Sequence, residues 1–367
     1  MGILQPIWDG TFVYREPVCF SADKDGRPTG GTLLYQPEEI LSVTSFDGSV
    51  FYQPVRDYTA NGRQLVRTEA SRIPYLERSV YCKPFTGVPE TAWVRLSGGQ
   101  AYMEVVSDVY RWQTLVTYTH RDKWAGFQPE ACGESLPRSM EKLRAGGDFH
   151  LTLYGDSITA GWEASGCNER AIDMVTLGEY HVSLWHAPYQ PAWAELVANA
   201  LQARYPQSNV IKTNHAAGGS TVQWGVEHAA ELVPPCKPDL IMLGFGMNSM
   251  QESAEDYRRA ILSIIRTIRK ECHDCEFVLM SPMIPNPEIK GFQNNQLPAQ
   301  QDVLYQIAAE LEGVCIAPVH SVFREMTARG KHYLELTGNC INHPNDFSVR
   351  VYAQTVLRTL GVDGNDG

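Results

Sequence analysis

Strand and helix patterns alternate along the second part of the chain, and this alternation limits the folds that the chain can adopt. Short apolar or β-branched runs predict strands, and apolar residues at helical spacing predict the helices between them. The predicted strands span residues 149–154, 208–213, 240–243, 276–280 and 314–318. The predicted helices span residues 193–205, 300–311 and 346–360, with one more that begins after Ser253. Strands that alternate with helices form right-handed crossovers, so the sequence predicts a parallel sheet in a three-layer α/β domain.

The helix that follows Ser253 carries the clearest local signals. Asp256 lies three residues after Ser253, in a position like that of a capping box. Isoleucines then recur at i, i+3, i+4 and i+7, namely Ile261, Ile264, Ile265 and Ile268. This spacing places the four side chains in one apolar stripe and predicts an amphipathic helix.

Residues 1–145 have a different pattern. Short β-branched and aromatic runs are separated by turn dipeptides such as Asp25-Gly26, and no helical period is sustained. Strands are expected at residues 32–35, 49–52, 92–96 and 113–119, and the last of these alternates as a half-buried strand does. The sequence therefore predicts an all-β sandwich of jelly-roll-like form over 1–145 as an accessory domain, followed by the α/β domain over 146–367.

The charge and the apolar content of the chain exclude several classes of partner. Its 367 residues include 31 Lys and Arg against 42 Asp and Glu, for a net charge of −11, whereas nucleic-acid binding relies on cationic side chains. The longest apolar stretch, residues 240–250, is shorter than the ~20 residues of a membrane span. The first residues lack the pattern of a signal peptide, and nine cysteines fit a reducing compartment. We expect a cytoplasmic protein without nucleic-acid or membrane partners, and we leave homo-oligomer formation open.

Residues that can carry chemistry gather near the ends of the predicted strands, where α/β sheets bind ligands. Ser157 directly follows a buried strand, and its hydroxyl needs a base to become a nucleophile. Gly218 and Gly219 would let a backbone N–H approach a ligand closely. Asn248 follows another strand, and its amide can donate to an oxyanion. His343, at the start of the last helix, supplies an imidazole.

The order of these segments, Gly-Asp-Ser, Gly, Gly-x-Asn and His-Pro-Asn, resembles the SGNH/GDSL hydrolase superfamily over residues 148–360. The resemblance implies that Ser157 is the nucleophile and that His343 is the general base. It also implies an oxyanion hole formed by the backbone N–H groups of Ser157 and Gly219 and by the side chain of Asn248. The implied reaction is two-step acyl transfer from an ester, with no metal and no organic cofactor.

The sequence departs from the family pattern at two positions. Ser249 follows Asn248 where the family commonly has Asp. Cys340 lies three residues before His343, where the family has the Asp that orients the imidazole. We expect a Ser-His dyad in which the main-chain carbonyl of Asn339 or Cys340 accepts the imidazole N–H. Glu335 is the alternative acceptor from the same segment.

The segment after the nucleophile, residues 162–191, is long and rich in aromatic side chains. Aromatic rings stack well on sugar faces, so Trp162 and Trp185, together with Trp224, are candidate substrate-binding residues. The alternative is that these rings pack this segment against the β-rich region. The sequence favours neither interpretation over the other.

A β-domain in front of an SGNH domain resembles the arrangement of two-domain carbohydrate acetylesterases, several of which lack the catalytic Asp. The resemblance implies a serine esterase that removes O-acetyl groups from hemicellulose-type oligosaccharides, such as acetylated xylo- or manno-oligosaccharides. One alternative keeps the chemistry and changes the substrate, as in a general short-chain esterase, a lysophospholipase or a thioesterase. The other alternative is a non-catalytic carbohydrate-binding protein on the same scaffold.

Overall fold

The computed structural model describes residues 3–84, 93–95, 101–104 and 109–362. The centre of its second region is a parallel sheet of five strands, in the order β14-β11-β15-β16-β17. Its strands are β11 (Gly147–Gly155), β14 (Ser208–Asn214), β15 (Leu240–Gly244), β16 (Glu276–Met280) and β17 (Val314–Ala317). Each of the five predicted strands is present, within three residues at its ends. The predicted parallel sheet is therefore confirmed.

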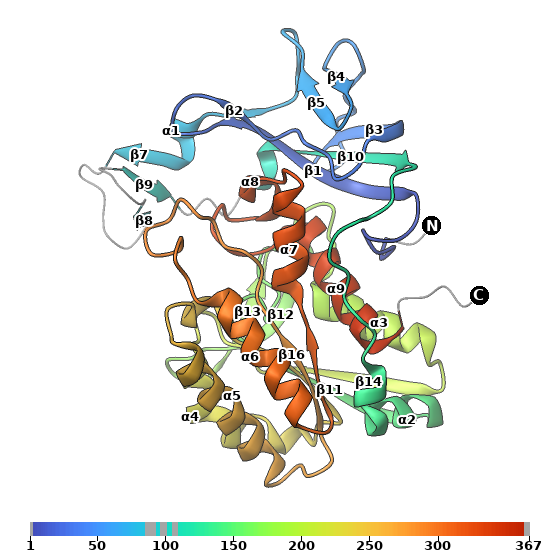
Figure 1. Cartoon of the computed structure of the whole chain (residues 1–367), viewed down its shortest axis with the longest axis vertical. Coiled ribbons are helices and arrows are strands. Elements are labelled where there is room, and N and C mark those ends of the chain that lie inside the picture. Colours follow the sequence, from blue (N-terminus) through green and yellow to red (C-terminus); the bar gives the residue numbers. More distant parts are fainter. Residues whose placement is uncertain (1–2, 85–92, 96–100, 105–108, 363–367) are drawn as a thin grey trace.

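Helices cover both faces of this sheet (Figure 1). They are α2 (Pro137–Ala145), α3 (Trp193–Arg204), α4 (Val222–Leu232), α5 (Ala254–Arg269), α6 (Leu297–Glu310), α7 (Val319–Ala328) and α9 (Asp346–Leu360). Alternate side chains of one strand enter different cores, since Leu240 and Met242 pack with α2, α3, α7 and α9. Ile241 and Leu243 pack with α4, α5 and α6. The three-layer α/β class is thus confirmed.

The helix after Ser253 forms as predicted. In α5 the Ser253 side chain accepts a hydrogen bond from the Asp256 N–H, and the four isoleucines of the stripe are buried. Helix α6 begins at Leu297, before the predicted start at residue 300, because a proline occupies its first turn without losing a needed N–H. Helices α2, α4 and α7 were not expected from the apolar spacing.

The N-terminal region is built on a second sheet, in the order β2-β1-β10-β3, with β6 paired to β1 (Figure 1). Its strands are β1 (Phe12–Ala22), β2 (Pro28–Thr29), β3 (Pro37–Ser45), β6 (Tyr75–Leu76) and β10 (Gln113–His120). The smaller elements are β4 (Tyr58–Asn61), β5 (Gln64–Arg67), α1 (Arg78–Tyr81), β7 (Cys82–Pro84), β8 (Trp93–Arg95) and β9 (Ala101–Glu104). The β-rich character is confirmed, while the jelly-roll-like sandwich stays a prediction.

The individual strands of this region were predicted less well than those of the parallel sheet. Strand β10 confirms the prediction at 113–119, although it is buried on both faces instead of alternating. Strand β8 confirms the centre of 92–96, whose end residues lie outside the described residues. The predictions at 32–35 and 49–52 are wrong, because each segment contributes only an isolated bridge.

Helix α2 lies within residues 1–145 but packs on the parallel sheet. The Ser139 N–H donates to Glu276 of β16 at 2.8 Å, and Lys142 pairs with Asp239 at 2.7 Å. The division at residue 145 remains a proposal. The packing of α2 associates this helix with the α/β region.

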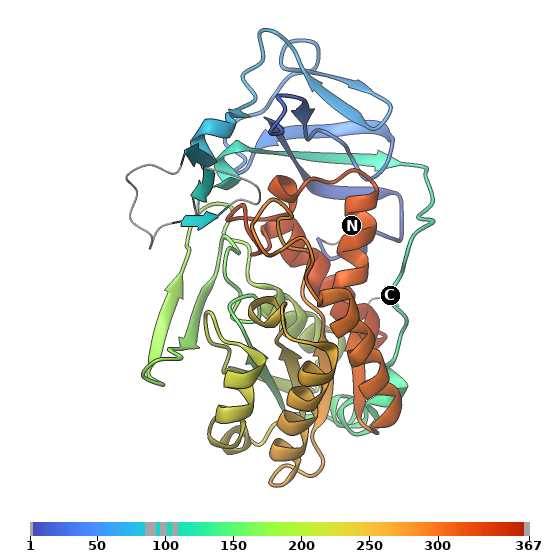
Figure 2. The same cartoon turned by 60° about the vertical axis from the view of Figure 1, so that its left-hand side comes forward.

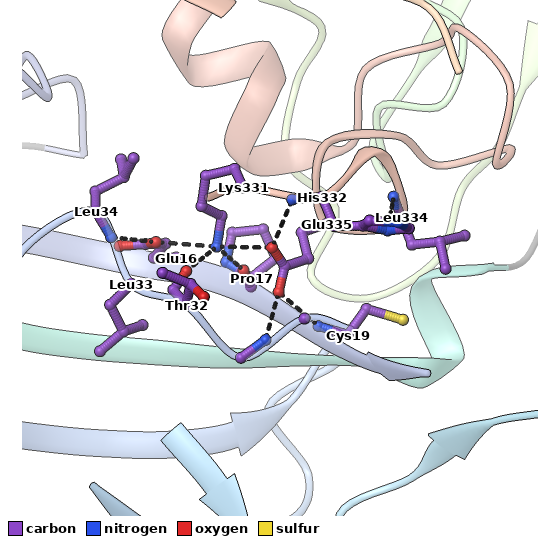
Figure 3. A network of polar contacts seen from close by, with 12 residues as sticks. Glu16, Pro17, Cys19, Thr32, Leu33, Leu34, Lys331, His332, Leu334 and Glu335 are labelled. Atoms are coloured by element: carbon purple, nitrogen blue, oxygen red, sulfur yellow. Dashed lines mark hydrogen bonds and ion pairs between the residues drawn. The ribbon is translucent and has the colours of Figure 1, made fainter. Parts of the chain in front are cut away.

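A buried ion network joins the two regions (Figure 3). The Lys331 ammonium lies 3.0 Å from Glu16 of β1 and 3.4 Å from Glu335, and all three side chains are fully buried. It also donates to the carbonyls of Pro17 and Thr32. Burial alone would lower the pKa of Lys331, but the two carboxylates raise it above its ordinary value. The network thus holds a charged lysine between the N-terminal sheet and the segment that leads to His343.

Candidate active site

The first, second and third polar segments are those that carry Ser157, Gly219 and Asn248, and glycines let them meet at the carboxyl ends of β11 and β15. Gly155 pairs with Gly244, and a Cβ on Gly155 would collide with the Gly244 carbonyl and with the side chain of Thr159. The Gly155 carbonyl accepts hydrogen bonds from the Ala217 N–H at 2.9 Å and from the Ser220 hydroxyl at 3.0 Å. A side chain at Gly155 would therefore separate the strand ends that carry Ser157, Gly219 and Asn248.

The structure brings Ser157 and His343 into direct contact although 186 positions separate them in the sequence. The Ser157 Oγ lies 2.8 Å from the His343 Nε2. Ser157 is 5% exposed and the His343 side chain 12%, so the pair is screened from bulk water but not sealed. A hydroxyl in hydrogen-bond contact with an imidazole is the arrangement that a serine nucleophile and its base require.

Asp156 shapes the turn that presents Ser157. Its carboxylate accepts from the backbone N–H groups of Ile158 at 3.0 Å and Thr159 at 3.4 Å. The carboxyl group is buried, and this burial raises the pKa of Asp156 to about 6 despite these hydrogen bonds. In this chain, the acidic residue of the Gly-Asp-Ser segment thus holds the turn.

The histidine loop, residues 337–345, is folded around the side chain of Asn339. The Asn339 Oδ1 accepts from the N–H groups of Ile341, Asn342 and His343 at 2.9–3.1 Å. The Gly338 N–H donates to the His343 carbonyl at 3.0 Å. These local bonds fix the backbone from which the imidazole reaches Ser157.

The N-terminal sheet also holds the histidine loop. The Gln113 side chain of β10 donates to the carbonyls of Leu334 at 2.7 Å and Thr337 at 2.8 Å, and it accepts from the Asn345 side chain at 3.0 Å. Asn345 caps α9 by accepting from the Ser348 N–H. The loop is therefore anchored by both regions of the molecule.

The predicted oxyanion-hole donors lie around Ser220. The Asn248 amide donates to the Ser220 carbonyl at 3.0 Å, which leaves its second hydrogen for another acceptor. Gly219 adopts φ +78° and is exposed, as is Asn248. Within the described residues, the N–H groups of Ser157 and Gly219 donate to no protein acceptor. These donors can serve a negatively charged oxygen.

Ser249, the first departure from the family pattern, has a structural role. Its hydroxyl accepts from the Val222 N–H at 2.9 Å, at the start of α4, and its carbonyl accepts from the Gln300 side chain at 2.8 Å. The short neutral side chain of Ser249 thus joins this segment to α4, and its backbone carbonyl joins the segment to α6. The family's Asp is replaced here without leaving a buried hydroxyl unpaired.

The three candidate substrate tryptophans have different surroundings. Trp162 is partly buried and meets the His343 ring edge-on, with 5.5 Å between ring centroids. Trp185 is 60% exposed and packs on Tyr189. Trp224 is buried against Tyr154 in the core, which leaves little of its ring for a ligand.

The segment 162–191 contains a β-hairpin that was not expected, formed by β12 (Asn168–Ile172) and β13 (Glu179–Ser183) (Figure 2). The hairpin is joined to the second polar segment, because the Ile172 N–H donates to the Ala216 carbonyl. After the hairpin, His186 stacks on Tyr110 of the N-terminal region at 4.1 Å. Part of this segment therefore does pack against the β-rich region.

None of the three predicted acceptors, the Asn339 and Cys340 carbonyls and Glu335, is hydrogen-bonded to the His343 Nδ1. Among the described residues, the His343 Nδ1 is buried without a hydrogen-bond partner. The Cys340 carbonyl accepts from the Asn286 side chain instead, and Glu335 belongs to the Lys331 network. In the described part of the chain, the carboxylate nearest to this nitrogen is that of Glu163, at 3.9 Å, a residue that the sequence did not single out.

The described residues hold no group of three or more His, Cys, Asp and Glu side chains placed to bind a metal ion. All nine cysteines are free thiols. No helix in the described part of the chain combines the length and the apolar character needed to cross a membrane.

The parallel sheet and the polar segments at its strand ends define an SGNH-type hydrolase, a carboxylic ester hydrolase. The chain belongs to the GDSL-like Lipase/Acylhydrolase family, whose model matches residues 153–348, more than half of the chain. The match spans the region from the end of β11 into α9. It therefore includes each of the polar segments described above.

Solved structures with similar folds include esterases. A two-domain esterase (CEX) active on acetylated mannans is 19% identical with a TM-score of 0.48, over 66% of this chain and 56% of that one. Axe2, an acetylxylan esterase from Geobacillus stearothermophilus, is 20% identical with a TM-score of 0.46, over 59% of this chain and 96% of that one. This chain thus matches little more than half the length of the two-domain esterase. No curated protein matches the chain.

Proposed function

We propose that this ester hydrolase removes O-acetyl groups from carbohydrate through an acyl-enzyme on Ser157. The observation that carries the proposal is the 2.8 Å contact between the Ser157 Oγ and the His343 Nε2. The contact lies at the carboxyl edge of the sheet, where the backbone N–H groups of Ser157 and Gly219 are available. It supports acyl transfer more directly than carbohydrate binding without catalysis.

In the proposed mechanism, the His343 Nε2 takes the Ser157 proton while the Oγ attacks the acetyl carbonyl. The N–H groups of Ser157 and Gly219 and the free amide hydrogen of Asn248 donate to the resulting oxyanion. The protonated His343 then donates to the sugar oxygen that leaves. In the second step His343 activates water, which attacks the acetyl-enzyme and releases acetate.

Carbohydrate is the proposed alcohol part of the ester because of the aromatic surface beside the reacting pair. Trp162 borders His343 and remains partly exposed, so its ring can contact a sugar whose acetyl group reaches Ser157. Acetylated xylo- or manno-oligosaccharides are the proposed substrates. The free thiols fit a reducing compartment, so we propose that the enzyme acts in the cytoplasm on imported oligosaccharides.

One observation favours a different acyl group. Met174 and Val175, in the turn of the β12–β13 hairpin, are exposed, and Met174 lies close to Gly219. An apolar surface near the oxyanion hole suits a longer acyl chain, as in a lysophospholipase or a thioesterase. The acyl-chain preference separates this alternative from the acetylesterase.

The test is hydrolysis of 4-nitrophenyl acetate, butyrate and octanoate by the wild type and the Ser157→Ala and His343→Ala variants. Ser183→Ala, at an exposed serine of β13, is the matched control. We expect 4-nitrophenyl acetate to be the best substrate and the control to be unchanged. We expect activity to vanish in Ser157→Ala and to fall to a small residual turnover in His343→Ala. Release of acetate from acetylated xylo- and manno-oligosaccharides then identifies the sugar.

Three results would contradict the proposal. Preference for octanoate would assign the enzyme to the longer-chain alternative. Full activity in Ser157→Ala would exclude the acyl-enzyme at that residue. An inactive wild type on both the synthetic and the acetylated sugar esters would favour the non-catalytic binding protein.

A further inference from the structure

The imidazole of His343 needs a partner for its second nitrogen. In a serine hydrolase this partner fixes the tautomer and stabilises the imidazolium that forms during attack. Cys340 occupies the position of the family's Asp, and the buried His343 Nδ1 has no hydrogen-bond partner among the described residues. An unpaired buried nitrogen at this position calls for an acceptor that the sequence pattern does not provide.

Glu163 faces this nitrogen from the turn that follows the nucleophile. Its Oε1 lies 3.9 Å from the His343 Nδ1, and its side chain is 10% exposed. The carboxylate and Ser157 thus lie on opposite sides of the same ring, Oε1 3.9 Å from Nδ1 and Oγ in contact with Nε2. Hydrogen bonds of catalytic groups are often long in the absence of substrate and shorten in the complex.

The backbone around Glu163 is arranged for this position. Glu163 adopts φ +68°, a conformation that is uncommon and costly for a residue with a side chain. Gly338 of the histidine loop packs against it, and a Cβ there would lie 2.7 Å from the Glu163 Cβ and 3.2 Å from its Oε2. The absence of a side chain at position 338 lets the carboxylate reach the loop that carries His343.

The other carboxylates near the site are occupied. Asp156 accepts from two backbone N–H groups of its own turn. Asp346 accepts from the N–H and the hydroxyl of Ser165 at 2.8 and 2.7 Å. Glu335 is bonded within the Lys331 network. Glu163 has no such set of partners among the described residues.

We propose that Glu163 is the positioning residue of the catalytic histidine and replaces, from the nucleophile's own turn, the Asp missing from the histidine loop. The inference rests on the proposed function, in which His343 acts as the base for Ser157. The carboxylate accepts the Nδ1–H, which leaves Nε2 free to take the Ser157 proton. It then stabilises the imidazolium until the proton passes to the leaving oxygen.

The first test compares Glu163→Gln with the wild type, using 4-nitrophenyl acetate. Glu179→Gln, at an exposed carboxylate of β13, is the matched control for the loss of one negative charge. We expect kcat to fall at least about 100-fold, towards the roughly 10⁴-fold seen when a triad carboxylate becomes an amide. We also expect KM to stay within about threefold, since the residue acts only through His343.

A double variant separates positioning from a general structural effect. Because Glu163 acts through His343, Glu163→Gln in a His343→Ala background should cause no further loss of residual turnover. Glu163→Asp, which keeps the charge on a shorter side chain, should recover part of the activity lost in Glu163→Gln. Thermal unfolding of each variant shows whether the fold is retained.

The outcomes distinguish this inference from the proposed function. A folded Glu163→Gln variant with wild-type kcat would overturn the role of Glu163 and leave the proposed function standing. The same would follow if Glu163→Gln lowered turnover equally in the wild-type and His343→Ala backgrounds. If Glu163→Gln does not fold, the Glu163→Asp variant tests the role of the carboxylate instead. A Glu163→Asp variant that folds but is as inactive as His343→Ala would count against that role. Full activity of Ser157→Ala or His343→Ala would instead overturn the proposed function.

Discussion

Asp156 is an acidic residue whose burial has a cost at neutral pH. Its side chain lies beneath the Ser157 turn, and burial raises its pKa to about 6, against about 3.9 in an unfolded chain. The native state therefore binds the proton more tightly than the unfolded state does. The stability that this group contributes is fully present below about pH 4 and is lost as the pH rises through about 6.

Asp156→Asn removes this titration while keeping the size of the side chain. Between pH 4 and pH 7 the wild type loses the stability that this group contributes, whereas the variant does not. We therefore expect the free energy of unfolding of the variant to rise relative to that of the wild type over this range. Two pKa units correspond to a shift of about 3 kcal/mol. Urea unfolding of both proteins across this range measures it, and a difference that does not change with pH would contradict the assignment.

The sequence located Ser157 and His343 because their motifs are local, and the structure places them in contact. It missed Glu163, because nothing in the neighbouring residues indicates which carboxylate the fold will bring to His343. The signal present in the sequence was only an acidic residue six positions after the nucleophile. The position of the Glu163 carboxylate near the Nδ1 depends on its packing against Gly338, which is distant in the sequence.

At the scale of elements, the histidine loop depends on β10 as well as on α9. Gln113 is buried, and its side chain makes three hydrogen bonds. It donates to the carbonyls of Leu334, just before the loop, and Thr337, at the start of the loop, and accepts from the Asn345 side chain, which caps α9. Removing a buried partner leaves polar groups unsatisfied, which costs about 1–3 kcal/mol for each group. The loop and the sheet are therefore expected to be coupled in stability and in activity.

Gln113→Met retains the approximate volume of the side chain but none of its hydrogen bonds. We expect a loss of at least about 3 kcal/mol in the free energy of unfolding, about 1 kcal/mol or more for each of the three groups, and a lower kcat at unchanged KM. Gln202→Met, at a glutamine whose bonds lie far from the histidine loop, is a control that should leave kcat unchanged. A stable variant with wild-type kcat would show that β10 does not hold the loop.

The burial of each element explains which elements could be predicted from the sequence. The strands of the parallel sheet are buried by helices on both faces, so their apolar runs are strong signals. Residues 32–35 are just as apolar, but they are buried without forming a strand. The N–H of Leu34 donates to the Glu16 side chain and that of Tyr35 to the Tyr118 hydroxyl. An apolar run therefore predicts that a segment is buried, but not that it forms a strand. In residues 32–35, hydrogen bonds to side chains take the place of hydrogen bonds to a neighbouring strand.

At the scale of the molecule, the N-terminal region and the α/β region share one buried polar centre. Lys331 lies between Glu16 and Glu335, and no side chain of the three contacts bulk water (Figure 3). Glu335 also accepts from the backbone N–H groups of Cys19 and Gly31. The N-terminal sheet is therefore part of the structure that supports the histidine loop, beyond the accessory role that the sequence suggested.

Lys331→Met leaves two buried carboxylates without a counter-charge. We expect it to lower the free energy of unfolding by about 3–5 kcal/mol, the usual cost of breaking a buried ion pair. The matched control is Lys142→Met, which breaks the partly exposed pair with Asp239 and should cost about 0–1 kcal/mol. Equal losses in the two variants, measured by urea unfolding, would contradict a special role for the buried network.

The proposed nucleophile of this ester hydrolase is Ser157, activated by His343. A 4-nitrophenyl phosphonate, which reacts irreversibly with activated serines, tests it most directly when the labelled residue is mapped by peptide mass spectrometry. We expect one label, on Ser157, that is absent in Ser157→Ala and forms far more slowly in His343→Ala. A label on another residue, or labelling of Ser157 at an unchanged rate without His343, would contradict it.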